Sequence, residues 1–219
     1  ASFENNYLQL IHKVASTGKP LIISTGMASV EELHEAVSTA RGAGCKDIIL
    51  LKCTSTYPAS AENCNVLTIP NMRKLFECEV GLSDHTLGIG VAVAAVAHGA
   101  SVIEKHFTLS RSDGGVDSAF SLEPDELKSL VIETEIAWKS LGSVVYGATG
   151  NEEKSKIFRR SLYIAEDMNA GEVFTKNNLR IIRPGGGLPP KYYDQFIGKK
   201  IKTAAIKGQP ITWDLISPD

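Results

Sequence analysis

The sequence has little of the material from which membrane-spanning and secreted proteins are built. Its longest apolar stretch, 88–97, is far shorter than the roughly 20 residues that a transmembrane helix needs. The opening Ala-Ser-Phe-Glu is not the basic and then apolar run of a signal peptide. With 43% hydrophobic and 22% charged residues, the chain has the composition of a globular protein. We therefore expect a protein that does not cross a membrane.

Neither the cysteines nor the basic residues form a recognisable binding motif. No CxxC pair and no zinc-type spacing links the four cysteines, which are Cys45, Cys53, Cys64 and Cys78. Scattered cysteines of this kind are typical of reduced thiols in a cytoplasmic protein. The formal net charge is -2, and the short basic cluster at 199–202 is typical of a solvated face. We expect a cytoplasmic location and no nucleic-acid partner.

Short apolar runs recur along the first half of the chain, separated by helical patterns. The runs are 20–27, 47–54, 79–86 and 101–108, and each ends in small polar or ionisable residues. Continuous apolar runs of this length are typical of parallel strands buried on both faces. Between them, Ser29 is a candidate helix N-cap and 88–98 a small-residue helix, while Pro124 occupies a first helical position. This alternation predicts an α/β fold, either a (β/α) barrel or a doubly wound sheet.

The domain organisation follows from the same patterns. Four strands do not close an eight-stranded barrel, so we interpret 1–142 as part of a barrel whose first strands are missing, with 1–4 as the tail of another strand. Residues 143–160 are polar and charged and predict a linker. Residues 161–219 predict a small β-rich domain, because short alternating segments lie between turns. Its expected strands are 161–165, 172–175, 179–183, 201–206 and 210–213.

Five motifs, in order and at matching spacing, resemble the sialic acid synthase family. They are Ser-Thr-Gly-Met at 24–27, Cys-Thr-Ser-Thr-Tyr-Pro at 53–58, Gly-Leu-Ser-Asp-His-Thr at 81–86, Glu-Lys-His-Phe-Thr at 104–108 and Gly-Gly-x-Asp at 114–117. The segments 160–164 and 183–185 resemble the antifreeze-like (SAF) domain that ends these enzymes. The resemblance implies the C-terminal half of a (β/α)8 TIM barrel followed by a β-clip domain.

The resemblance also implies a reaction. Family members join carbon 3 of phosphoenolpyruvate to the aldehyde of an open-chain N-acylated amino sugar and release phosphate. The segment 109–124 is similar to pseudaminic acid synthases, which use a 2,4-diacetamido-2,4,6-trideoxy hexose for surface glycans or flagellin. N-acetylneuraminate and legionaminate synthases are the alternatives within the family. A metal-dependent aldolase, or a non-catalytic carbohydrate-binding module built on the SAF domain, are alternatives of other classes.

Two histidines are candidate metal ligands. His85 and His106 end consecutive predicted strands, and adjacent strands lie about 4.8 Å apart, so their imidazoles can converge. The resemblance assigns them a divalent metal, with Mn²⁺ favoured over Mg²⁺ or Co²⁺, that polarises a carbonyl. Separately hydrogen-bonded core histidines are the alternative. Glu104 shares a strand face with His106, and the resemblance implies that it handles protons or orients substrate, the alternative being a surface salt bridge.

The remaining site residues are also implied by the resemblance. Ser2, Ser24 and Ser83 match contacts to phosphoenolpyruvate, while Ser55 stands where the neuraminate enzymes carry asparagine. Tyr57 and Asp117 match positions that hold the sugar, although Tyr57 is also compatible with simple packing. Arg183 matches an arginine that reaches the sugar in the other subunit, which implies a domain-swapped homodimer. The family's phosphate-binding lysines belong to earlier strands, so we expect the chain by itself to be inactive.

Overall fold

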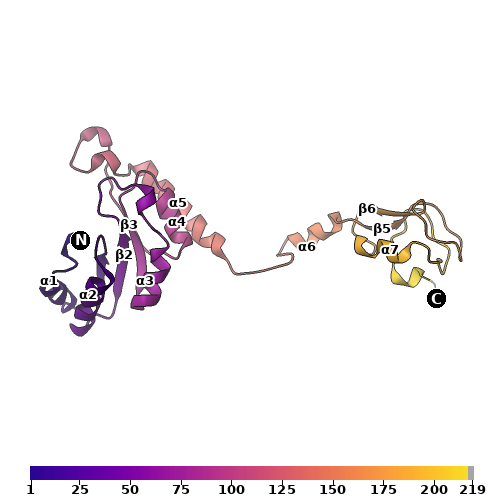
Figure 1. Cartoon of the computed structure of the whole chain (residues 1–219). Helices are drawn as coiled ribbons and strands as arrows, with labels where there is room; N and C mark the ends of the chain where they lie inside the picture. Colours follow the sequence, from indigo (N-terminus) through magenta and orange to yellow (C-terminus); the bar gives the residue numbers. More distant parts are fainter. Residues whose placement is uncertain (217–219) are drawn as a thin grey trace. The chain divides into compact units, whose positions relative to one another are not determined.

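The computed structural model describes residues 1–216 of the chain. It divides into two compact units, Ala1–Ser143 and a second that begins at Val144 (Figure 1). No helix within the described range is long and apolar enough to cross a membrane. Each unit has a hydrophobic core of its own. We therefore describe the two units separately.

The first unit is organised around a parallel sheet. Its strands are β1 (Leu21–Ser24), β2 (Ile48–Cys53), β3 (Glu79–Asp84) and β4 (Ile103–Lys105), hydrogen-bonded in the order β1-β2-β3-β4 (Figure 1). Each lies within one of the four predicted apolar runs. Leu50 and Val80 at the middle of the sheet are completely buried, as parallel strands covered by helices require.

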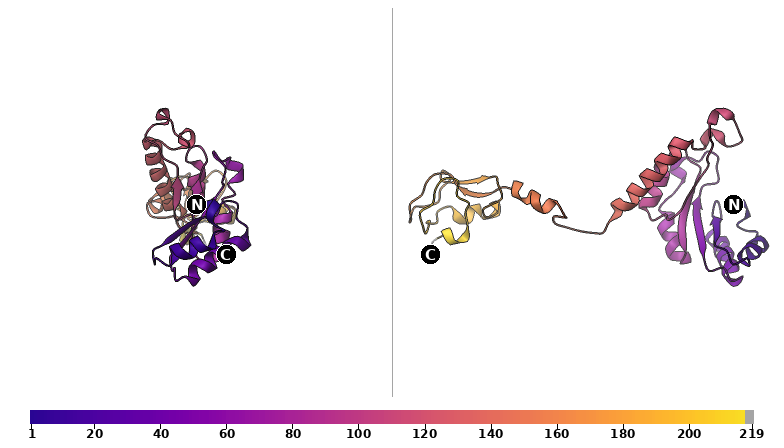
Figure 2. Two further views of the ribbon diagram at one scale, coloured as in Figure 1. Left: turned by 90° about the vertical axis from the view of Figure 1, so that its left-hand side faces the viewer. Right: turned by 180° about the vertical axis from the view of Figure 1, so that it is seen from behind.

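Helices follow the strands and pack on the sheet and on one another (Figure 2). They are α1 (Leu8–Ala15), α2 (Val30–Gly42), α3 (Thr68–Phe76), α4 (Gly90–Ala97) and α5 (Pro124–Leu141), with short 3-10 helices η1 (Ser2–Glu4), η2 (Ala61–Asn63), η3 (Arg111–Asp113) and η4 (Ser118–Phe120). Ser29 caps α2 and Pro124 opens α5, both as predicted, and the structure adds a capping box between Ser29 and Glu32. Leu33 and Val37 of α2 are buried in the same core as Leu50.

The prediction for the first four residues is wrong. Residues 2–4 form the 3-10 helix η1 rather than the end of a strand, with the Glu4 amide donating to the Ala1 carbonyl at 3.2 Å. The segment is held by Asn5, whose side-chain amide donates to the Thr25 carbonyl at 2.7 Å. This bond ties the first residues to the loop that follows β1.

The second unit contains a two-stranded antiparallel sheet, β5 (Ser161–Ile164) with β6 (Leu179–Ile182). Leu162, Phe174 and Phe196 are completely buried in its core. Short helices complete it: α6 (Glu152–Ser155), η5 (Lys156–Phe158), η6 (Pro190–Tyr192), α7 (Tyr193–Phe196) and η7 (Trp213–Leu215). The predicted linker 143–160 therefore contains two helical turns, α6 and η5.

Three of the five strands predicted for this unit are not regular strands. The segments 172–175, 201–206 and 210–213 contribute only isolated bridges, such as Val173 with Lys200 and Met168 with Ala205. Gly171, Gly198 and Gly208 adopt φ angles of +87°, +85° and +87°. Turns at such short intervals interrupt the extended chain before a ladder can form. The last residues of the predicted domain, 217–219, lie outside the described range.

Candidate functional site

The candidate site of the first unit lies where the parallel strands end. Ser24 is the last residue of β1, Ser83 and Glu104 lie within β3 and β4, and His85 and His106 follow those strands directly. The register pairs Ser83 with Glu104 across β3 and β4. Active-site groups of barrel enzymes are found at this carboxyl end of the sheet. The fold thus brings together residues that are far apart in the sequence.

His85 is buried and held in one tautomer. Its Nδ1 lies 2.9 Å from the Thr54 carbonyl oxygen, which can only accept, so Nδ1 carries the hydrogen and Nε2 keeps its lone pair. The Tyr57 ring lies against it, with centroids 4.3 Å apart. Contact with the Cys53 thiol raises the pKa of His85, against the opposing effect of burial.

His106 faces His85 at the end of the next strand, with ring centroids 5.2 Å apart. Its Nδ1 lies 3.6 Å from Oδ2 of Asp117, which comes from the loop after β4. Phe120 of the same loop packs on the His106 ring at 5.0 Å. Arg111 holds this loop through Glu123, at 3.4 Å, and through Glu126.

The pair of histidines fits a divalent metal. Histidine ligands normally direct their second ring nitrogen at a carbonyl or carboxylate, which is how Nδ1 of His85 faces Thr54 and Nδ1 of His106 faces Asp117. Both Nε2 atoms are thereby left for coordination. Within residues 1–216, no cluster of three or more His, Cys, Asp or Glu side chains is arranged for a metal. A metal bound here would therefore keep positions for water or substrate.

Glu104 lies beside the histidines and is held by one hydrogen bond. The Ser83 hydroxyl donates to its Oε1 at 2.7 Å. Within the described range, Glu104 forms no ion pair, so the alternative of a surface salt bridge finds no partner there. Its carboxylate is exposed on the strand that leads to His106.

Two of the predicted serines, Ser2 and Ser55, meet around Gly26, and Ser24 ends the strand that precedes it. The Ser55 hydroxyl donates to that of Ser2 at 2.8 Å, and a Cβ on Gly26 would lie 2.5 Å from Ser2 Cβ and 2.6 Å from Ser55 Oγ. The buried Ser24 hydroxyl has no hydrogen-bond partner within residues 1–216. This hydroxyl helps to lower the pKa of the neighbouring Cys53 thiol and is otherwise free to donate to a substrate oxygen. Cys53 lies beside Ser55 at 3.6 Å.

Two further groups of the site have shifted pKa values. Burial alone would raise the pKa of the Cys53 thiol, but hydrogen bonding, with His85 first, lowers it to about 6. Burial raises the pKa of the Tyr57 phenol. Tyr57 is only partly covered, being 44% exposed. It touches both histidines and Phe120, so its packing and substrate-contact interpretations are compatible.

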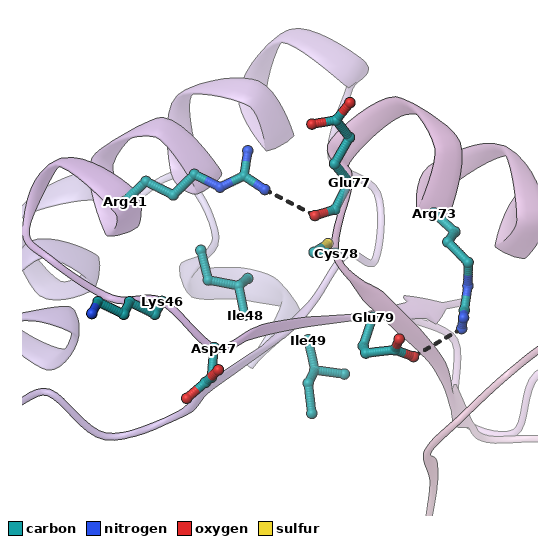
Figure 3. Close-up of a pocket in the computed structure, with 9 residues that line it drawn as sticks. All are labelled: Arg41, Lys46, Asp47, Ile48, Ile49, Arg73, Glu77, Cys78 and Glu79. Atoms are coloured by element: carbon teal, nitrogen blue, oxygen red, sulfur yellow. Dashed lines mark hydrogen bonds and ion pairs between the residues drawn. The ribbon is translucent and has the colours of Figure 1, made fainter.

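A hollow of about 520 Å³ lies elsewhere, at the amino ends of β2 and β3 (Figure 3). The two arginines that line it already have partners: Arg41 donates to the Glu77 carbonyl at 3.2 Å, and Arg73 pairs with Glu79 at 3.1 Å (Figure 3). Groups at this end of barrel strands usually serve stability. The hollow is therefore no candidate for the chemistry.

One predicted site residue, Arg183, belongs to the second unit. Arg183 follows β6 in the second unit and is exposed. Sequence reasoning missed the Thr54 carbonyl, because a backbone acceptor leaves no signature in the residue type. It also missed Phe120 and the buried pair Asp84–Lys105, although both members of that pair flank a histidine in the motifs.

Comparisons with known proteins agree with this geometry. A model of the NeuB family matches residues 1–146, and a model of the SAF domain matches 159–217. The chain is 42% identical over 200 residues to a pseudaminic acid synthase of Campylobacter jejuni, covering 91% of this chain and 58% of that protein. It is 40% identical over 201 residues to an N,N'-diacetyllegionaminic acid synthase of the same species, covering 90% and 60%.

A solved structure extends the similarity to the fold. The spore coat polysaccharide biosynthesis protein SpsE of Bacillus subtilis superposes with a TM-score of 0.62 at 32% identity, covering 100% of this chain and 66% of that one. The chain thus spans about three fifths of the length of these relatives. The predicted α/β half-barrel followed by an antifreeze-like domain is confirmed. On the family match over residues 1–146, this chain belongs to the NeuB family.

Proposed function

We propose that the chain is part of a synthase that condenses phosphoenolpyruvate with an open-chain N-acylated amino sugar. The observation that carries the proposal is the meeting of His85, His106 and Glu104 at the carboxyl ends of β3 and β4 in a NeuB-family chain. The expected product is pseudaminic acid, which the 42% identity to a pseudaminic acid synthase supports. The N,N'-diacetyllegionaminic acid synthase is nearly as similar, at 40% identity, so N,N'-diacetyllegionaminic acid is the alternative product.

The proposed reaction forms a bond between carbon 3 of phosphoenolpyruvate and the aldehyde carbon. Water adds at carbon 2, phosphate leaves, and the aldehyde oxygen becomes a hydroxyl. Nε2 of His85 and of His106 would hold a divalent metal, Mn²⁺ by preference, which polarises the aldehyde carbonyl when bound. Glu104, held by Ser83, moves a proton at the reacting sugar oxygen. Thr54 and Asp117 keep the two imidazoles in place.

Separate groups of residues are proposed to contact the two substrates. The hydroxyls of Ser24 and Ser2 are proposed donors to the phosphate and carboxylate oxygens of phosphoenolpyruvate. Ser55 and Ser83, whose hydroxyl hydrogens are directed at Ser2 and Glu104, are proposed as further contacts of this substrate. Tyr57 and Asp117 contact the sugar beside the histidines. The chain alone is expected to be inactive, because within residues 1–216 β1 and β4 are the edges of the sheet and Ile22 of β1 is 50% exposed.

The choice of sugar is tested by phosphate release from phosphoenolpyruvate with the full-length protein. A 2,4-diacetamido-2,4,6-trideoxy sugar of the altrose series should react with a higher kcat/KM than N-acetylmannosamine. A site that pairs a second amide is left with unmatched polar groups when that amide is missing. A clear preference for N-acetylmannosamine would instead assign the protein to the neuraminate synthases.

Arg183 is proposed to complete the site of a second subunit in a domain-swapped homodimer. It is exposed at the end of β6, and a guanidinium suits an N-acyl carbonyl or a pair of hydroxyls. Full-length Arg183→Ala and His85→Ala variants, each nearly inactive, should regain roughly a quarter of wild-type activity when mixed dimers form at random. No recovery in dimers shown by mass spectrometry to be mixed would exclude the crossed site.

Other expectations from the sequence stay predictions. A cytoplasmic location agrees with four free thiols but is not tested by them. An aldolase would share the paired histidines but gives no reason for the antifreeze-like domain. A purely carbohydrate-binding role would leave the two facing histidines and Glu104 without a purpose.

A further inference from the structure

A buried ion pair lies between the two strands that carry the histidines. Lys105 Nζ and Asp84 Oδ2 are 2.8 Å apart, and their side chains are 3% and 0% exposed. Each residue immediately precedes a histidine in the sequence, His106 and His85 respectively. A charged pair at such depth carries a desolvation cost that hydrophobic residues of similar size would avoid. Its presence beside the site therefore needs an explanation beyond stability.

The pair holds the chain on both sides of His85. Oδ1 of Asp84 accepts from the Thr86 amide at 2.9 Å and from the Thr86 hydroxyl at 2.8 Å. Lys105 Nζ donates to the Thr86 carbonyl as well as to Asp84. Residues 84 and 86 are thus both fixed, and His85 lies between them. The lysine that fixes them is covalently adjacent to His106.

Three successive positions link the ends of β3 and β4. Ser83 is bonded to Glu104, Asp84 to Lys105, and the rings of His85 and His106 face each other at 5.2 Å. Successive side chains of a strand point to opposite faces. The ion pair therefore joins the two strands from the face opposite to the one that presents Glu104 and the histidines.

We propose that Asp84 and Lys105 are positioning residues that set the geometry of His85 relative to His106. The inference rests on the proposed role of these histidines as metal ligands. Through this ion pair, Thr86, which follows His85, is bonded to Lys105, which precedes His106. Among residues 1–216, the other links between the two strand ends are the short β3–β4 ladder and the Ser83–Glu104 bond, and both stop before the histidines.

The discriminating variant replaces both charges at once in the full-length protein, as Asp84→Leu with Lys105→Met. Removing both leaves no uncompensated buried charge, so the fold should persist. We expect the dissociation constant for Mn²⁺, measured by electron paramagnetic resonance, to rise about 10- to 100-fold, as for other losses of support to metal ligands. Asp84→Asn with Lys105→Met, which keeps an acceptor for Thr86 and leaves no unpaired buried charge, should have a smaller effect and serves if the first double variant does not fold.

The matched control is the Arg73–Glu79 pair at the other end of β3, whose side chains are 40% and 57% exposed. Arg73→Met with Glu79→Gln should leave Mn²⁺ affinity unchanged even if it lowers the melting temperature. A double variant at 84 and 105 that melts lower but binds Mn²⁺ as wild type does would overturn the inference, because the pair would then be merely structural.

A metal-free readout separates this inference from the proposed function. In the apoprotein, the Nδ1–H of His85 donates to the Thr54 carbonyl. This imidazole hydrogen should therefore exchange slowly with water, which is measured by nitrogen-15 NMR. The double variant should lose that protection. A wild type that binds no Mn²⁺ would refute the metal proposal but leave this test standing, whereas unchanged protection in the double variant would refute the positioning role.

Discussion

Alanine at position 26 would disturb the loop after β1 in two separable ways. Gly26 adopts a φ of +48°, a left-handed conformation that costs an alanine about 1–2 kcal/mol. In addition, the new methyl group would lie 2.5 Å from Ser2 Cβ and 2.6 Å from Ser55 Oγ, well inside van der Waals contact. Forcing extra volume into a packed site typically costs a further 1–3 kcal/mol. We expect Gly26→Ala to lower the free energy of unfolding by about 2–5 kcal/mol.

A glycine elsewhere provides the control. Gly18 has a φ of +72°, and a Cβ there would meet nothing within 4 Å. Gly18→Ala should therefore show the conformational cost alone, about 1–2 kcal/mol. Both variants are compared by urea unfolding in the full-length protein. Because Ser2 and Ser55 are proposed contacts of phosphoenolpyruvate, Gly26→Ala should also raise the KM for that substrate while Gly18→Ala does not. Equal destabilisation and an unchanged KM for both variants would refute the packing of the two serines around Gly26.

Three further predictions concern stability and pH. Leu50→Ala in β2, at a completely buried position, should lower the free energy of unfolding by about 3–5 kcal/mol in urea unfolding, and a loss below 1 kcal/mol would contradict the buried sheet. Ser29→Ala removes the cap of α2 and should cost about 1 kcal/mol, whereas Ser29→Asp should restore most of it. Arg111 lowers the pKa of Glu126 below 4.5, so their interaction stabilises the fold above that pH and is lost as the pH falls through the lowered pKa. The melting temperatures of wild type and Glu126→Gln should thus differ at pH 7 and converge in acid; a constant difference would argue against the ion pair.

The sheet of the first unit could be predicted from sequence because its two central strands, β2 and β3, are largely buried. Runs such as 47–54 leave no alternation that could be mistaken for a surface strand, and Ser29 with Glu32 marks the start of α2 unambiguously. Helix α3 was not predicted, because it is short and contains Pro70. The proline is tolerated since it lies in the first turn, where its missing amide hydrogen has no partner to lose.

The strands of the second unit were harder to predict from the sequence, for a physical reason. Its chain is extended in many places, but glycines such as Gly171 and Gly208 turn it before a continuous ladder can form. Alternating residues therefore predicted strands where the structure has isolated bridges. Burial of Phe174 and Phe196, rather than a sheet, organises this core, and that packing is not visible in local periodicity.

Some features of the site could likewise be predicted from the sequence and others could not. His85 and His106 could be proposed from sequence because each ends an apolar run, and strand ends converge in parallel sheets. The bond from His85 to the Thr54 carbonyl and the pairing of Asp84 with Lys105 depend on the register of neighbouring strands. Register is a property of the assembled sheet, so these contacts appeared only in the structure.

The central claim is that His85 and His106 hold a metal that the condensation requires. The most direct measurement is phosphate release from phosphoenolpyruvate and amino sugar by the full-length protein, after chelation and Mn²⁺ add-back. His85→Ala should lower the rate at least about 100-fold, equivalent to about 2.7 kcal/mol, while His98→Ala, at an exposed position after α4, should not change it. A His85→Ala variant that keeps the wild-type rate after Mn²⁺ add-back would contradict the account.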